Sequence, residues 1–107
     1  MKAPKNLYYL VHTVNTPEMR FVDEIINKVV DVLKIEKYSL FSKSRKRDNV
    51  EARAVIWTIL KLKRRSWSSV KLGALFFRDH ATALHGMNLA KEIPEIQQKI
   101  RRVMNEL

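Results

Sequence analysis

The sequence predicts an all-α domain, a bundle of helices that includes a helix-turn-helix pair. Apolar residues recur at spacings of three and four positions through most of the chain after residue 16, as they do in amphipathic helices. The chain has two glycines, and it contains no hairpin-turn sequence and no internal repeat. Its 107 residues can form one modest hydrophobic core but not two.

Residues 1–15 are the part whose structure the sequence predicts least well. The stretch from Leu7 to Val14 is rich in aromatic and β-branched residues, as in a strand, but no second strand candidate exists to pair with it. It could equally form a short helix or an ordered arm. We therefore separate an N-terminal extension, residues 1–15, which could bind a protein partner, from a helix-turn-helix domain, residues 16–107.

A first long helix is predicted to begin after Thr16. Thr16 suits the N-cap position and Pro17 the first helical position, while Glu18 places an acidic side chain at the positive end of the helix dipole. A helix of about four turns follows. Its predicted inward face consists of Phe21, Val22, Ile25, Ile26, Val29, Val30 and Leu33. The cluster of Tyr38, Leu40 and Phe41 predicts one further helical turn.

The polar run from Ser42 to Arg47 cannot be buried and is predicted to form a basic loop. Asp48 or Asn49 is expected to cap the next helix, with Glu51 in its first turn. The apolar residues of this helix cover a face too wide for a surface position, and they are Val50, Ala54, Val55, Trp57, Ile59, Leu60 and Leu62. We therefore expect a central helix that ends in the cations of residues 61–65.

Two helices separated by a tight turn are predicted between residues 68 and 91. The first has Ser68 or Ser69 as its N-cap and ends before Arg78. Its predicted apolar residues are Val70, Leu72, Leu75 and Phe76. The second helix begins at Asp79, which can serve as its N-cap. This is the arrangement that sets a second helix into the major groove of DNA.

The second helix of the pair has two different sides. A helical wheel places Ala83, Leu84, Met87 and Ala90 toward the core. The opposite side carries small or polar residues that would let a DNA groove approach closely, and they are Ala81, Thr82, His85 and Asn88. Pro94 then opens a last helix. The apolar face of that helix is predicted to be Ile96, Ile100, Val103, Met104 and Leu107.

The net charge of +10 favours a polyanionic partner. Residues 42–65 hold nine basic and two acidic side chains, and therefore +7 of this charge. The basic ones are Lys43, Arg45, Lys46, Arg47, Arg53, Lys61, Lys63, Arg64 and Arg65. A single run of this kind is often only solvated surface, but two runs that bracket one helix favour a nucleic-acid interface.

Several other classes of protein are disfavoured. No apolar tract is long enough to span a membrane and no apolar signal region follows Met1, so we expect a soluble, cytoplasmic and nucleoid-associated chain. The absence of cysteine excludes disulfides and thiolate metal sites. His80 and His85 would lie about 140° apart on a helix, which does not suit a helical zinc pair. With no Ser or Cys nucleophile beside them, we expect no enzyme, no catalytic residue, no metal and no cofactor.

The run from Leu72 to His85, LGALFFRDHATALH, closely resembles the hallmark of the C-terminal DNA-binding domain (domain IV) of the bacterial replication initiator DnaA. That hallmark reads Ile-Gly, a few residues, Phe, a linker of one or two residues, Arg-Asp-His-Thr-Thr, two apolar residues and His. The resemblance continues upstream and covers about residues 21–107. It implies a Trp-repressor-like fold and sequence-specific binding to double-stranded DNA, in replication or its regulation.

The resemblance also implies a role for each matching residue. Arg45 of the basic loop would enter the minor groove, and the major-groove readers would be Asp79, His80, Ala81 and Thr82. The positions expected near the DNA backbone are Lys43, Arg47, Arg53, Lys61, Ser68, Val70, Arg78 and His85. The chemistry suits these roles, because Asp79 can accept a bond from a cytosine amino group and Thr82 can contact a thymine methyl.

The chain departs from the family pattern at three positions. Ala81 stands where Thr or Ser is usual, which leaves the preferred DNA site open, and Val70 stands where Pro is common. Phe77 makes the turn short and apolar instead of supplying a Gly. The sequence has no counterpart of the initiator's ATPase module, since glycines at 73 and 86 cannot form a GxxxxGK[ST] loop, so we expect no bound nucleotide.

Two alternatives remain at this level. The same surface could serve a protein-interaction module with an acidic partner, or a repressor-like regulator that binds an unrelated operator. Taken singly, Asp79 could be only an N-cap and His80 a buried, hydrogen-bonded histidine.

Overall fold

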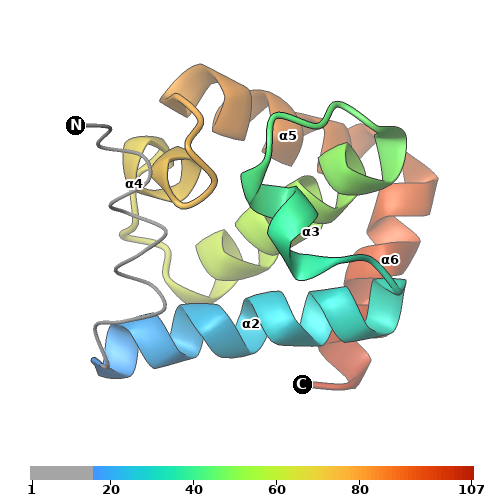
Figure 1. Cartoon of the computed structure of the whole chain (residues 1–107), viewed down its shortest axis with the longest axis horizontal. Helices are drawn as coiled ribbons and strands as arrows, with labels where there is room; N and C mark the ends of the chain where they lie inside the picture. Colours follow the sequence, from blue (N-terminus) through green and yellow to red (C-terminus); the bar gives the residue numbers. More distant parts are fainter. Residues whose placement is uncertain (1–15) are drawn as a thin grey trace.

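The computed structural model describes residues 16–107, in which every regular element is a helix. The elements are α2 (Pro17–Leu33), the 3-10 helix η1 (Lys37–Phe41), α3 (Arg47–Lys63), α4 (Ser69–Ala74), α5 (His80–Glu92) and α6 (Pro94–Asn105) (Figure 1). The predicted all-α class is confirmed for this part of the chain. The expectations for residues 1–15 fall outside the described residues, and the division of the chain at residue 16 stays a prediction.

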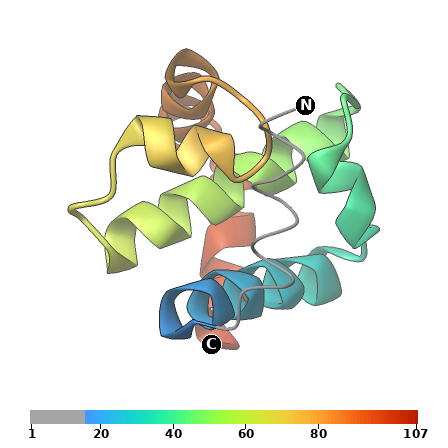
Figure 2. The same ribbon diagram turned by 60° about the vertical axis from the view of Figure 1, so that its left-hand side comes forward.

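Helix α3 is central, as predicted. It runs between α2 on one side and the α4–α5 pair on the other, and it also packs on η1 and α6 (Figures 1 and 2). Residues 51–57 are buried without interruption, which requires neighbours on every side of a helix. Helix α3 is therefore the support on which the helix-turn-helix pair is mounted.

Helix α2 begins and ends for local reasons. The Met19 amide donates a hydrogen bond to Thr16 Oγ1 at 3.1 Å, as expected of an N-cap. Lys34 ends the helix in the left-handed conformation, with φ at 59°. The buried part of its inward face is Val22, Ile25, Ile26, Val29 and Val32. Each fully buried Val or Ile stabilises the fold by roughly 1.5–3 kcal/mol relative to an exposed one, so this face attaches α2 to the core.

The start of α3 differs from the prediction. The helix begins at Arg47 with Lys46 at the N-cap, so neither Asp48 nor Asn49 caps it. The Asn49 side chain is buried and has other partners, because it donates to Ser44 Oγ at 2.9 Å and accepts from Ser39 Oγ at 2.9 Å. Asn49 thus joins α3 to η1 and to the loop between them.

Five residues that were expected on apolar faces are exposed instead. Their exposed fractions are 47% for Leu62, 63% for Val70, 46% for Leu84, 36% for Met104 and 48% for Leu107. A wheel gives the direction of a face but not its width, and the neighbouring helices cover only the middle of these faces. On α5 the covered strip is Ala83, Gly86 and Ala90.

In the described part of the chain, no helix combines the length and the apolar composition needed to span a membrane.

Candidate nucleic-acid interface

Both helices of the helix-turn-helix begin at a side-chain cap. Ser68 Oγ accepts the Lys71 amide at 3.1 Å at the start of α4. Asp79 Oδ1 accepts the Thr82 amide at 2.9 Å at the start of α5. Each cap satisfies a backbone donor that the first helical turn leaves free. The predicted N-caps Ser68 and Asp79 are confirmed.

Gly73 and Phe77 form the tight turn between the two helices. The Arg78 amide donates to Gly73 O at 2.9 Å, and a Cβ on Gly73 would lie 2.6 Å from Asp79 O, too close to be tolerated. Phe77 has φ at 62°, a left-handed conformation that glycine adopts far more readily. The ring of Phe77 lies 6.1 Å from that of Phe41. Packing against Phe41 therefore helps to stabilise Phe77 in a backbone conformation that glycine would adopt more easily.

Trp57 of α3 fixes the position of both helices. Its Nε1 donates to Leu72 O of α4 at 2.7 Å, and its ring centroid lies 5.8 Å from that of Phe76. On the α5 side, a Cβ on Gly86 would come within 2.8 Å of the Trp57 ring. Because Gly86 has no side chain, α5 lies directly against the indole, and α3 determines its orientation.

The side chains of α5 that were predicted to face DNA lie on its exposed side. Asp79, His80, Ala81, Thr82, His85 and Asn88 are all exposed. The alternative in which His80 is a buried, hydrogen-bonded histidine is therefore wrong. Hydrogen bonds from the Thr82 amide and then from its hydroxyl lower the pKa of the Asp79 carboxyl below its usual value. Asp79 is thus ionised at neutral pH and can only accept hydrogen bonds.

The basic loop, residues 42–46, is shaped by serine hydroxyls. The Ser44 amide donates to Ser42 Oγ at 3.2 Å, and the Lys46 amide donates to Ser44 Oγ at 3.2 Å. Lys43, Arg45 and Lys46 are exposed. Local turns of this kind fix the backbone while the three cations stay accessible.

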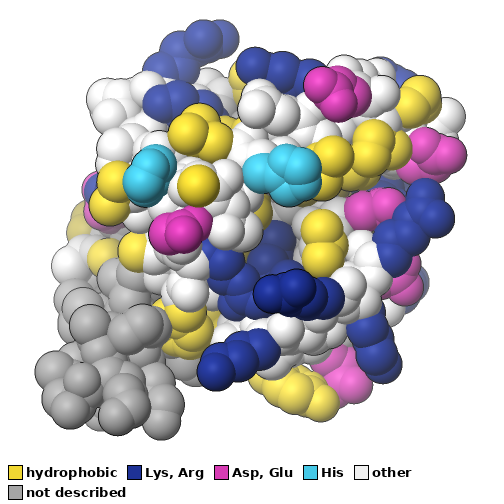
Figure 3. Space-filling model, turned by 90° about the horizontal axis from the view of Figure 1, so that it is seen from above, with side chains coloured by type: hydrophobic (Ala, Val, Ile, Leu, Met, Phe, Trp, Pro, Cys, Tyr) yellow, Lys and Arg dark blue, Asp and Glu magenta, His cyan; other side chains and the backbone are white. Residues whose placement is uncertain are grey.

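A groove of about 950 Å³ separates the basic loop from α5. Its loop wall includes Lys43, Ser44 and Arg45, and its α5 wall includes Thr82, His85 and Leu89. Figure 3 looks onto this surface, where Lys and Arg side chains gather beside a hollow and two His side chains lie next to them. A groove lined by one sign of charge concentrates counter-ions of the opposite sign. The arrangement suits a polyanion that fits between the loop and the helix.

The sequence comparisons agree with this architecture. The family model described as the bacterial DnaA protein helix-turn-helix matches residues 22–89. The chain belongs to this family. Over 81 residues it is 35% identical to the chromosomal replication initiator protein DnaA of Bacteroides fragilis (strain YCH46), an alignment that covers 75% of this chain and 17% of that relative. No solved structure matches the chain.

Membership in the DnaA family confirms the resemblance inferred from the Leu72–His85 run, which lies entirely within the match. The family consists of the DNA-binding helix-turn-helix domains of a replication initiator. The helix-turn-helix and the exposed basic loop of this chain agree with DNA binding. The chain spans less than a fifth of the length of the Bacteroides fragilis protein.

In this DnaA-family domain, Arg53 does not lie where a contact with the DNA backbone was expected. It is 4% exposed, and its Nε donates to Leu40 O at 2.8 Å while its Nη2 donates to Ser39 O at 3.1 Å. Burial, and then the charge of Arg78, lowers the pKa of Arg53 to about 10, which leaves it charged at neutral pH. Such burial does not fit a residue that meets phosphate at the surface, so Arg53 instead joins α3 to η1.

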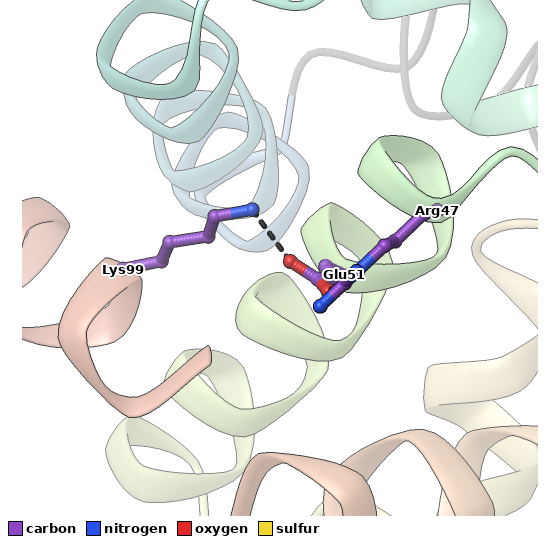
Figure 4. Close-up of polar contacts among 3 residues, drawn as sticks. All are labelled: Arg47, Glu51 and Lys99. Atoms are coloured by element: carbon purple, nitrogen blue, oxygen red, sulfur yellow. Dashed lines mark hydrogen bonds and ion pairs between the residues drawn. The ribbon is translucent and has the colours of Figure 1, made fainter. Parts of the chain in front are cut away.

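Arg47 is exposed at the first turn of α3 and also has an internal partner. Its Nε donates to Glu51 Oε2 at 2.8 Å, and Lys99 Nζ of α6 donates to Glu51 Oε1 at 2.6 Å (Figure 4). Burial alone would raise the pKa of Glu51, but the hydrogen bonds and charges of Lys99 and Arg47 outweigh it and lower the pKa. Arg47 thus belongs to the helix and not to the basic loop, although its side chain is 76% exposed.

Three further positions lie around the start of α4. Lys61 Nζ donates to Arg65 O at 2.9 Å and to Trp67 O at 2.6 Å, which closes the connection between α3 and α4. An ammonium has three donors, so one remains for a phosphate. Ser68 and Val70 are exposed and stay candidates for backbone contact.

Two residues have interactions that the sequence analysis missed. It indicates Asn49 only as a helix cap and Arg78 only as a backbone contact, whereas both hold the basic loop. Their partners are hydroxyls and carbonyls of other segments, which no spacing in the sequence reveals. In residues 16–107, no group of three or more His, Asp or Glu side chains is placed to hold a metal ion.

Proposed function

We propose that this chain binds double-stranded DNA with sequence preference, with α5 in the major groove and Arg45 in the minor groove, in the manner of DnaA-box recognition. The observation that carries this proposal is the pair of exposed surfaces, basic loop and α5, on the two walls of one groove. The major and minor grooves of a duplex lie on either side of one sugar-phosphate strand. That strand would run along the protein groove while each wall enters one DNA groove.

The chemistry at the start of α5 supports base reading. The N-terminal residues of a recognition helix are the ones that reach base edges. Asp79 Oδ1 accepts the Thr82 amide, and the carboxylate keeps further lone pairs that can accept a cytosine amino group. Ala81 and Thr82 are exposed and small enough for a thymine methyl to pack against them.

The remaining contacts would be made with phosphates and would fix the register on the duplex. We assign this role to Lys43, Arg47, Lys61, Ser68, Val70 and His85, and we revise the role of Arg53 as described above. Lysine and arginine neutralise phosphate charge, and the amides at the start of α4 can also bind phosphate oxygens.

We place this binding in replication initiation or its regulation, without ATP hydrolysis by this chain. The family supports the replication context, and the two glycines of the sequence cannot make the phosphate loop of an ATPase. A cytoplasmic, nucleoid-associated location and a protein partner for residues 1–15 belong to the same proposal.

Salt dependence of binding to a labelled duplex tests this function directly. We expect the logarithm of the binding constant to fall with the logarithm of salt concentration by about 0.9 per phosphate contact, with roughly 4 to 8 contacts. Fluorescence anisotropy on the full chain measures this slope. An affinity that is the same at low and physiological salt would contradict the proposal, and tight binding to an acidic protein but not to duplex would favour the interaction module.

A further inference from the structure

Arg78 connects the turn of the helix-turn-helix to the basic loop. Its guanidinium donates through Nη1 to Phe76 O in the turn and through Nη2 to Ser42 O at 2.6 Å in the loop. These two acceptors are 34 positions apart in the sequence, because they lie at residues 76 and 42. A planar guanidinium holds its donors in a fixed fork, so the two segments are fixed relative to each other.

Arg53 of α3 donates to the same carbonyl oxygen, that of Ser42. Its Nη2 donates to Ser42 O at 3.2 Å as well as to Ser39 O, and its Nε donates to Leu40 O. A carbonyl oxygen has two lone pairs and can accept both arginines. Arg53 and Arg78, which we call the arginine bridge, therefore join α3, the basic loop and the turn before α5 at one atom.

The arginine bridge places two positive charges close together and partly away from water. Both guanidinium groups are partly withdrawn from water, and burial lowers the pKa of Arg53 and of Arg78. Two cations that share one acceptor also repel each other, which is why Arg78 lowers the pKa of Arg53 further. Both residues line the groove between the loop and α5. Both guanidinium groups thus contact the loop that forms one wall of the groove.

We propose that Arg78 is a positioning residue that, together with Arg53, sets the separation between the basic loop and α5. This inference rests on the proposed function: Arg45 on one wall and Thr82 on the other can meet their base pairs in the same site only if the walls are at the right distance. Arg78 then contributes to specificity through Arg45, without contacting phosphate itself. This differs from the backbone contact that the sequence indicates for Arg78.

The experiment is a double-mutant cycle between Arg78→Met and Arg45→Ala, read as affinity for the selected duplex. Methionine keeps an unbranched side chain but removes the fork. In the wild-type background, Arg45→Ala should lower affinity on the order of tenfold. In the Arg78→Met background, the same change should lower affinity only about twofold, because Arg45 is already misplaced. Equal losses in both backgrounds would overturn the inference.

The salt slope separates positioning from phosphate contact. Arg78→Met should leave the slope unchanged if Arg78 positions the loop, and should lower it by about one unit if Arg78 neutralises a phosphate. Arg101→Met is the matched control, since Arg101 is exposed on α6 and its loss should change neither the slope nor the cycle. If Arg78→Met melts too early to be used, Arg78→Lys keeps the charge and the cycle is repeated with it.

Hydrogen exchange of the free protein separates this inference from the proposed function. Amides of residues 43–46 should exchange faster in Arg78→Met than in wild type, whether or not the wild-type chain binds duplex DNA. If the wild type binds no duplex, the proposed function fails on its own. If exchange in the loop is the same in both proteins, the bridge does not hold the loop and the inference fails.

Discussion

At the scale of single residues, Asp79 has an observed capping role and a proposed base-reading role, and one substitution can separate them. It caps α5 through the Thr82 amide, and its ionised carboxylate is exposed where a base edge would lie. Asparagine also caps helices well but presents an amide that can donate as well as accept. Asp79→Asn should therefore keep the fold and move the preference at one base pair from cytosine toward adenine. A selection from random duplexes, with thermal melting as the control for folding, measures both.

If folded Asp79→Asn selects the same DNA site as wild type, Asp79 does not read a base. Its capping role would then account for the residue completely. Asn88→Ala on the same exposed side serves as the comparison, because no base-reading role is assigned to Asn88.

Capping residues could be predicted from the sequence, whereas bridging residues could not. Thr16, Ser68 and Asp79 act on amides three positions away, so their roles are local and the spacing reveals them. Arg53 and Arg78 act on carbonyls 11 and 36 positions away, at Ser42. From the sequence alone, the positive charge of these two residues predicted contacts with the DNA backbone. The sequence does not reveal that their guanidinium groups are turned toward carbonyls inside the protein.

At the scale of elements, the approach of α5 to α3 depends on Gly86. An added Cβ would lie 2.8 Å from the Trp57 ring, and Trp57 is anchored to Leu72 O. Gly86→Ala gains about 1 kcal/mol of helix propensity, but overpacking of this kind costs typically 1–3 kcal/mol. We therefore expect Gly86→Ala to be less stable than the wild type and to have a lower Tm. Asn88→Ala, exposed on the same helix, should leave Tm nearly unchanged, and a raised Tm in Gly86→Ala would show that the contact is not tight.

Glu51 joins α3 to α6 and should make stability depend on pH. Its lowered pKa means that its contribution is complete above the ordinary value of 4.5 and is lost as pH falls through the folded-state pKa. Glu51→Gln should cost about 1–2 kcal/mol at neutral pH. The difference from wild type should shrink as pH falls below 4.5. Urea unfolding over pH 3–7 measures this, with Glu24→Gln as an exposed control, and a difference independent of pH would contradict it.

Whole helices could be predicted better than their faces. The central position of α3 follows from its wide apolar face, and residues 51–57 are buried as that width requires. Leu84 was assigned to the core of α5 and is 46% exposed, because Gly86 and not Leu84 faces Trp57. A glycine carries no hydrophobic signal, so the sequence could not show that it marks the closest contact.

At the scale of the whole molecule, charge and shape converge on one surface. The segment that holds most of the +10 net charge supplies both the basic loop and all of α3, and the fold brings the loop beside α5. Concentration of charge in the sequence predicted a polyanionic partner. Only the fold reveals that the cations Lys43 and Arg45 and the predicted base reader Thr82 line opposite walls of one groove.

The most direct measurement of the central claim is a selection of binding sites from random duplexes by the full chain, with Arg45→Ala in parallel. We predict that the wild type enriches one short motif that includes an A·T-rich part, where a narrow minor groove attracts the Arg45 guanidinium. Arg45→Ala should keep the part read by α5 and lose the A·T preference. A folded wild-type chain that enriches no motif over the starting pool would contradict sequence-specific DNA recognition by this domain.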